Sequence, residues 1–157
     1  MKRKLKVLVI HGPNLKLLGE RSPEIYGSRT LSQLNSDLHK SARALGIELR
    51  IYQSNHEGKI IDKIHELRKW MDGLVINPGA LTHYSYSLRE AIDAVRVRAY
   101  EVHLSDIHAR TEPWRRISVL AEITEGQIMG KGVDSYREAL LALTRPPPQP
   151  QPSKEPW

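Results

Sequence analysis

The sequence predicts an α/β protein built on a doubly wound parallel sheet. Five short strand-like segments alternate with segments whose apolar residues recur every three or four positions, as on one face of a helix. The first strand-like segment, residues 5–10, is apolar almost throughout, which is typical of a strand buried on both faces. Parallel strands need crossover connections, which are right-handed, so we expect helices on both faces of the sheet.

Local signals place the individual elements in order along the chain. The clearest helix follows Thr30, an N-cap residue, with Gln33 placed to complete a capping box and Gly46 placed to end the helix. The strands are expected at residues 5–10, 47–52, 74–76, 100–104 and 127–129. The helices are expected at residues 31–45, 60–67, 88–95 and 136–143.

The length of 157 residues suits one domain, which we expect to span residues 1–143. Residues 144–157 are rich in proline, a composition that can neither continue a helix nor bury a core, so we expect a disordered tail there. Two interpretations of this tail remain open, a solvated terminus and a segment that binds a partner.

Composition excludes several kinds of chemistry. The chain has no cysteine, which excludes disulfides, thiolate zinc sites and a cysteine nucleophile. The apolar run at residues 5–10 is too short for a signal peptide or a membrane span, so we expect a soluble, cytoplasmic protein that does not enter the membrane. The net charge of +6 fits either a solvated basic surface or an anionic partner. Nucleic acid is disfavoured as that partner, because no basic face interleaved with aromatic residues is evident.

Polar residues follow four of the predicted strands. In a doubly wound fold the loops after the strands share one edge of the sheet, and ligands bind there. The residues that we expect to converge on one ligand are Asn14, Asn77, His83, His103 and Ser105.

Nucleotide and metal sites are disfavoured. Residues 12–19 lack both the G-x-G-x-x-G spacing of dinucleotide-binding proteins and the Gly-Lys-Ser/Thr of a phosphate-binding loop. The histidines show no clustered metal-ligand spacing, so a metal site would have to be assembled from distant loops. Dinucleotide and nucleoside triphosphate binding are therefore disfavoured, and so is a metal site.

Glu101 and His103 lie two residues apart on a predicted strand, so their side chains share one face. A carboxylate in that position orients the imidazole and favours its protonated form, which would make His103 a general acid. The alternative is a structural ion pair within the sheet.

Residues 19–27 form a connection longer than an ordinary strand-to-helix loop, which suggests a lid over the site. The lid carries Arg21 and Tyr26. Ionising a phenol of pKa near 10 at pH 7 costs about 4 kcal/mol unless a cation stabilises the phenolate, and Arg21 could supply that cation. Tyr26 is thus either a base or a hydrophobic anchor that closes the loop.

The motifs at the strand ends and on the lid resemble those of the type II 3-dehydroquinate dehydratases, over residues 5–143 and in the same order. They are Gly-Pro-Asn-Leu at 12–15, Pro-Glu-Ile-Tyr-Gly at 23–27, Gln-Ser-Asn-His-Glu-Gly at 53–58, Ile-Asn-Pro-Gly-Ala at 76–80 and Glu-Val-His-Leu-Ser at 101–105. The resemblance implies a flavodoxin-like, three-layer α/β/α fold with a five-stranded sheet. It also implies a metal-free and cofactor-free anti elimination of water from 3-dehydroquinate to 3-dehydroshikimate, in the shikimate pathway or in quinate catabolism.

The same resemblance implies a role for each catalytic residue. Tyr26, as phenolate, takes the proton beside the ketone, and Arg21 supports its ionisation. Asn14 holds a water against the oxygen of the resulting enolate. His103, oriented by Glu101, protonates the departing hydroxyl.

The resemblance also implies a substrate-binding set and an assembly. Because residues 110–115 are one residue longer than the family pattern, Arg116 is an alternative to Arg115 as the carboxylate ligand. Glu90 matches an acidic residue that reaches a neighbouring subunit's site, in a dodecamer built as a tetramer of trimers. The substrate-binding positions are Asn77, His83, Glu90, Leu104, Ser105 and Arg115.

A non-catalytic binding module on the same scaffold is the competing hypothesis. A module that had lost catalysis should have lost at least one proton-handling residue, yet the full set is present. We therefore favour the dehydratase.

Overall fold

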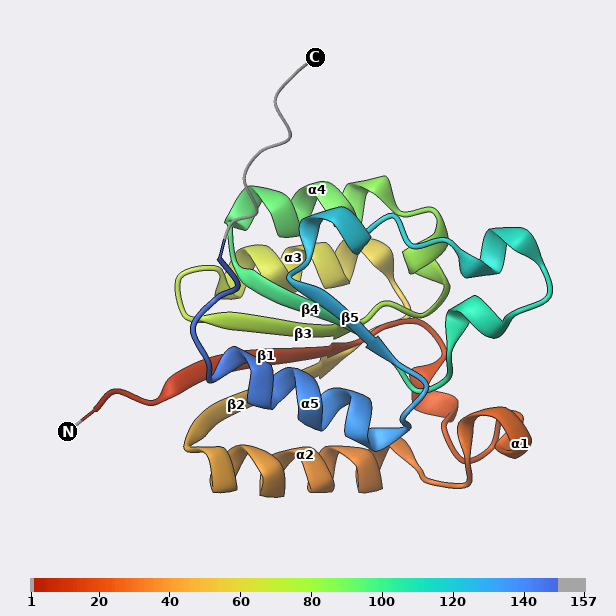
Figure 1. Cartoon of the computed structure of the whole chain (residues 1–157), viewed down its shortest axis with the longest axis horizontal. Coiled ribbons are helices and arrows are strands. Elements are labelled where there is room, and N and C mark those ends of the chain that lie inside the picture. The colour runs from red at the N-terminus through yellow and green to blue at the C-terminus, as the bar shows by residue number, and fades with distance from the viewer. Residues whose placement is uncertain (1, 150–157) are drawn as a thin grey trace, which may run out of the picture.

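A computed structural model describes residues 2–149, with the exception of the side chain of Tyr26. Its described part contains one parallel sheet with the strand order β2-β1-β3-β4-β5 (Figure 1). The strands are β1 (Leu5–His11), β2 (Ile47–Gln53), β3 (Gly73–Asn77), β4 (Arg98–His103) and β5 (Gly126–Met129). The prediction of a doubly wound sheet of five parallel strands is confirmed.

The helices cover both faces of this sheet. In Figure 1, α2 and α5 lie on one face and α3 and α4 on the other. The helices are α1 (Pro23–Tyr26), α2 (Leu31–Leu45), α3 (Glu57–Leu67), α4 (Tyr86–Val95) and α5 (Val133–Leu143). The four longer helices agree with the expected segments, whereas the short α1 lies within the predicted lid.

The ends of α2 follow from the local sequence. The backbone N–H of Gln33 donates to Thr30 Oγ1 at 3.2 Å, and the backbone N–H of Thr30 donates to Gln33 Oε1 at 3.0 Å. This reciprocal pair satisfies two donors that would otherwise lack partners in the first turn. Gly46 ends the helix with a φ of 68°, a left-handed conformation that glycine adopts without steric cost.

The alternation of side chains along β1 creates two core layers. Val7 and Val9 face α2 and α5, whereas Leu8 and Ile10 face α3 and α4, and all four are fully buried. Successive residues of a strand point to opposite faces, so a strand covered on both sides is apolar throughout. The sheet therefore forms the middle layer of a three-layer α/β/α domain.

The loops that follow β1 and β3 are held against each other. The backbone N–H of Gly12 donates to the carbonyl of Asn77 at 2.7 Å. A Cβ on Gly12 would lie only 2.6 Å from the carbonyl oxygen of Pro78, so no larger residue fits this approach. These loops lie beside the switch point of the sheet, because β1 pairs with β2 on one side and with β3 on the other.

Three strands continue one residue further than the apolar pattern indicates. The parallel ladder pairs His11 with Gln53 on one side and with Asn77 on the other, so polar residues complete β1, β2 and β3.

Toward the C-terminus, α5 ends at Leu143, and residues 144–149 form neither helix nor strand. The rest of the predicted tail, residues 150–157, lies outside the described residues. Within the described chain, no helix is long and apolar enough to cross a membrane.

Candidate active site

A cavity of about 420 Å³ opens at the carboxyl ends of β1, β3 and β4. Figure 1 shows that α1 and the segment between β4 and β5 project from this end of the sheet. Eight of the predicted site residues line the cavity: Asn14, Arg21, Asn77, His83, His103, Leu104, Ser105 and Arg115. The predicted convergence of the strand-end loops is thus present in the structure.

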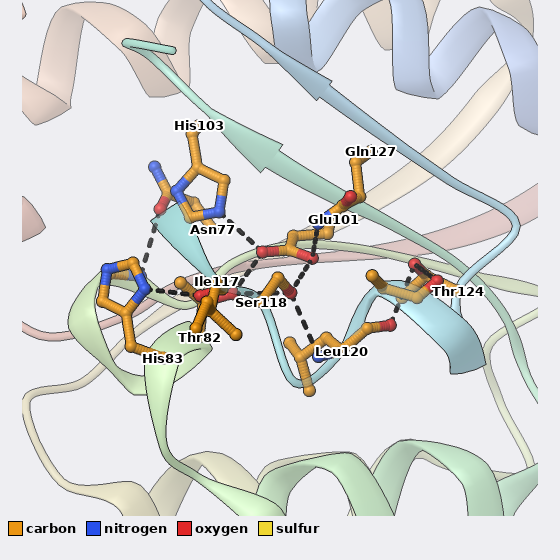
Figure 2. Close-up of polar contacts among 12 residues, drawn as sticks. Asn77, Thr82, His83, Glu101, His103, Ile117, Ser118, Leu120, Thr124 and Gln127 are labelled. Atoms are coloured by element: carbon orange, nitrogen blue, oxygen red, sulfur yellow. Dashed lines mark hydrogen bonds and ion pairs between the residues drawn. The ribbon is translucent and has the colours of Figure 1, made fainter. Parts of the chain in front are cut away.

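His103 lies in the cavity wall with Glu101 directly behind it. The two side chains point to the same face of β4, and His103 Nε2 lies 2.7 Å from Glu101 Oε1 (Figure 2). Because an ionised carboxylate can only accept, His103 donates from Nε2. Nδ1 is then the ring nitrogen that can exchange a proton with a ligand.

The Glu101 carboxylate is fully buried and receives four hydrogen bonds (Figure 2). Besides His103, its donors are the hydroxyls of Thr82 and Ser118 and the side-chain amide of Gln127, the last two at 2.7 Å. Burial by itself raises the pKa of Glu101, but the hydrogen bonds and the facing imidazole outweigh burial and hold the pKa below its usual range. Glu101 therefore stays ionised at neutral pH and orients the His103 ring by accepting the hydrogen bond from Nε2.

Asn14 also lines the cavity, and it has a left-handed conformation with φ at 70°. Asparagine tolerates this region better than most residues. The conformation is held by Asn55, whose Oδ1 accepts the backbone N–H of Asn14 at 3.0 Å and the side-chain amide of Gln53 at 3.1 Å. The loop after β2 thus positions Asn14 at the cavity.

The predicted lid contributes Arg21 to the cavity lining. It contains three residues with positive φ: Gly19 at 90°, Ser22 at 39° and Gly27 at 79°. The left-handed Ser22 precedes Pro23, which begins α1. Tyr26 ends that helix, and the position of its side chain lies outside the described part of the chain.

Arginine side chains from the segment after β4 also line the cavity. Arg115 lies in the lining with Arg110, whose Nη2 donates to Ser105 Oγ at 2.7 Å. Arg116 is not part of the lining, because its guanidinium donates to the backbone carbonyls of Arg110 at 2.5 Å and Thr111 at 2.8 Å. Of the two alternatives that the sequence left open, the structure places Arg115 at the cavity.

His83 is held in one orientation by its surroundings. Its Nδ1 lies 2.6 Å from the carbonyl of Ile117, so Nδ1 donates (Figure 2). The ring packs against Trp114 in a T-shaped arrangement with a centroid distance of 5.4 Å. Burial, with smaller contributions from the neighbouring His103 and Arg115, lowers the pKa of His83 and favours its neutral form. The neutral ring offers Nε2 as an acceptor to a hydroxyl.

Glu90 lies apart from these residues. It is exposed on α4 and does not line the cavity of its own chain. A role for Glu90 in catalysis therefore requires a second copy of the chain.

Among the residues that the prediction of the site omitted, six carry polar or aromatic side chains that line the cavity or hold Glu101. Arg110, Glu112 and Trp114 line the cavity, while Thr82, Ser118 and Gln127 hold the carboxylate behind His103. Arg110 follows closely after the polar end of β4, which was a usable signal. Ser118 and Gln127 had no such signal, because they lie 17 and 26 residues from Glu101 along the chain.

The charges of the lining favour an anionic ligand. Three guanidinium groups, those of Arg21, Arg110 and Arg115, accompany one carboxylate, Glu112. Planar guanidinium groups suit the recognition of a carboxylate. Among the described residues, no group of three or more acidic and histidine side chains is placed to hold a metal ion.

This fold, together with a cationic cavity and a histidine–carboxylate pair in its wall, is typical of an α/β enzyme that uses proton transfer on an anionic substrate. Comparison with known proteins is more specific. Residues 5–144 match the family described as dehydroquinase class II. The chain belongs to this family.

Individual relatives agree with the family match. The 3-dehydroquinate dehydratase of Anoxybacillus flavithermus is 52% identical over 139 residues, which cover 88% of this chain and 93% of the relative. The enzyme of the same name from Halothermothrix orenii is 53% identical over 138 residues, with the same coverage. The crystal structure of the type II dehydroquinase from Butyrivibrio crossotus superimposes with a TM-score of 0.88 at 44% identity, covering 90% of this chain and 99% of that one.

Proposed function

We propose that this protein is a 3-dehydroquinate dehydratase, a lyase that eliminates water from 3-dehydroquinate to form 3-dehydroshikimate. Membership of the class II family supports the reaction. The observation that carries the proposal is the His103–Glu101 pair in the wall of an arginine-lined cavity. The substrate is a carboxylic acid with hydroxyl groups, which suits this lining.

The reaction begins with proton removal. Tyr26, as phenolate, takes the proton beside the ketone and becomes a neutral phenol, while the electron pair moves to the ketone oxygen and an enolate forms. Arg21 on the same lid stabilises the phenolate beforehand. A water held by Asn14 donates to the enolate oxygen and stabilises the developing charge.

The second step expels water. As the enolate re-forms the ketone, the electron pair of its carbon–carbon double bond moves to form the new double bond of the enone, and the carbon–oxygen bond to the hydroxyl breaks. His103 donates its proton to the departing oxygen, which leaves as water. Glu101, held ionised by its hydrogen-bond donors, stabilises the protonated imidazole before this transfer. The phenol then returns its proton to His103 through solvent, which restores the enzyme.

The remaining predicted residues bind the substrate. Arg115 and Ser105, with the backbone at Leu104, take the carboxylate, while Asn77 and His83 take the hydroxyls. His83 suits this role because its neutral ring offers one acceptor nitrogen.

The proposal extends to assembly and location. We propose that residues 1–143 form the catalytic domain of a cytoplasmic dodecamer, arranged as a tetramer of trimers, in which Glu90 reaches the site of a neighbouring subunit. Its exposed position on α4 supports such a contact. The enzyme serves the shikimate pathway or quinate catabolism. Light scattering tests the assembly, with a monomer as the contradicting result.

Turnover can be measured directly, because the product is a conjugated enone with new ultraviolet absorbance. We expect the folded protein to convert 3-dehydroquinate in the presence of EDTA. Replacing Tyr26 by phenylalanine should reduce turnover at least about a hundredfold without changing assembly, because general base catalysis is lost. Tyr52→Phe is the matched control, since Tyr52 does not line the cavity. No turnover by folded wild-type protein would refute the function, and an active Tyr26→Phe variant would refute the base.

A further inference from the structure

A second buried polar cluster lies on the face of the sheet opposite to Glu101. Tyr136 of α5 stands at its centre, with its hydroxyl 3.0 Å from His11 Nδ1 and 3.1 Å from Asn77 Nδ2. His11 Nε2 lies 2.8 Å from Asn35 Oδ1 on α2. Of these four residues only Asn77 lines the cavity. The mechanism above uses none of the other three.

Each hydrogen bond in this cluster has one direction. The backbone N–H of Gly79, which can only donate, lies 3.2 Å from Asn77 Oδ1. The oxygen of the carboxamide therefore faces Gly79, and its nitrogen faces Tyr136.

The orientation of Asn77 also determines which way the hydroxyl of Tyr136 donates. Because the oxygen of Tyr136 accepts from Asn77, its single proton is available for His11 Nδ1. His11 then carries its own proton on Nε2 and donates to Asn35. The backbone N–H of Gly79 and the hydroxyl oxygen of Tyr136 thus hold the two ends of the Asn77 carboxamide in one arrangement.

The cluster is closed to solvent at its centre. His11 and Tyr136 have no exposed surface, and Asn77 retains 4% exposure where it meets the cavity. The rings of His11 and Tyr136 also contact each other, with centroids 5.4 Å apart. A buried amide without these partners could rotate by 180° and exchange its donor for its acceptor, so the cluster selects one orientation.

We propose that Tyr136, held by His11, is a positioning residue that fixes the orientation of the Asn77 carboxamide toward the substrate. Asn77 Nδ2 donates one of its two hydrogens to Tyr136, so the other remains to be donated to a hydroxyl of the substrate. This assignment rests on the proposed function. A substrate analogue that lacks this hydroxyl cannot accept the hydrogen bond from Asn77 Nδ2, so it does not benefit from the fixed orientation of the carboxamide. Tyr136 thereby contributes to specificity without touching the substrate.

The test is a double-mutant cycle on the full-length protein. Tyr136→Phe keeps the buried ring and removes the hydroxyl, and we expect kcat/KM to fall about threefold to tenfold. Asn77→Ala should lower kcat/KM further than Tyr136→Phe does, but it should retain measurable turnover because the proton-transfer groups remain. In the Asn77→Ala background, Tyr136→Phe should have no further effect.

Tyr100→Phe is the matched control. Tyr100 is half-buried against the same core layer and does not line the cavity, so its replacement also removes a phenolic hydroxyl but leaves Asn77 and its partners in place. We expect kcat/KM of this variant to stay within about twofold of wild type. A similar loss in the control would mean that core packing, not the orientation of Asn77, causes the effect.

A second variant covers the case in which Tyr136→Phe does not fold. Asn35→Asp places a carboxylate beside His11 Nε2, which favours a second proton on Nδ1 and turns that nitrogen from acceptor into donor. We expect kcat/KM to fall in this variant and the loss to disappear in the Asn77→Ala background. Losses that multiply across the two backgrounds, or an unchanged kcat/KM in the single variants, would overturn the positioning role. Failure of wild-type turnover would instead refute the proposed function.

Discussion

Lowering the pH should destabilise the fold through His11, by an amount that its burial determines. The side chain has no exposed surface, and burial lowers the pKa of His11 from 6.5 to about 4, although the hydrogen bond to Asn35 opposes this. In the unfolded chain the imidazole keeps its ordinary pKa, so between these two values the unfolded state binds more protons than the folded state. The contribution of the neutral His11 side chain to the free energy of unfolding is therefore fully present above the unfolded-state pKa of 6.5. It declines as the pH falls toward the folded-state pKa of about 4.

The magnitude follows from the two pKa values. Their difference of about 2.5, at about 1.4 kcal/mol for each pKa unit, corresponds to about 3 kcal/mol between pH 7 and pH 4. This is a large fraction of the total stability of an ordinary domain.

Urea unfolding at a series of pH values, at one fixed protein concentration, measures this loss. In His11→Gln the buried group no longer titrates, so we expect the free energy of unfolding to decline less between pH 7 and pH 4 than in wild type. His39→Gln is the control, because His39 is exposed on α2 and this variant should follow the wild-type curve. A constant difference between His11→Gln and wild type across this range would refute the reasoning.

Two further predictions concern the strand-end loops and the carboxylate site. Gly12→Ala should lower the free energy of unfolding by about 2–4 kcal/mol, because the new Cβ meets backbone atoms that cannot move aside. Gly58→Ala on α3 is the control, because a Cβ added there would meet no neighbouring atom within 4 Å, and this variant should be neutral or stabilising by up to about 1 kcal/mol. Thermal unfolding measures both variants, and equal changes in the free energy of unfolding would contradict the close approach at Gly12. Arg115→Lys should raise KM about tenfold, because lysine cannot form the paired hydrogen bonds of a guanidinium. Arg116→Lys should leave KM nearly unchanged, and the reverse ranking in steady-state kinetics would assign the carboxylate to Arg116 instead.

The elements of the fold were predictable because their signals are local. The capping box and terminal glycine of α2 lie within the helix or next to it, and both form as expected. The ends of the strands were predicted less accurately, because the backbone hydrogen-bond ladder continues through His11, Gln53 and Asn77 although their side chains are polar. The short helix α1 in the lid had no periodic signal, because four residues are too few to show one.

The candidate site was predictable where its residues follow strands directly. His103 and Glu101 share a face because side chains alternate along a strand, and this rule needs no knowledge of the tertiary structure. The choice between Arg115 and Arg116 could not be made in the same way. It depends on a turn in which Arg116 binds two backbone carbonyls.

By itself the sequence determined the order of strands and helices, the strand-end position of the chemical groups, and the family to which their motifs belong. Only the tertiary structure decided which distant residues support those groups. Gln127 meets Glu101 across 26 residues, and Tyr136 meets Asn77 across 59. The physical reason is that caps and periodicity act within a few residues, whereas these contacts exist only after the sheet has brought separate strands and helices together.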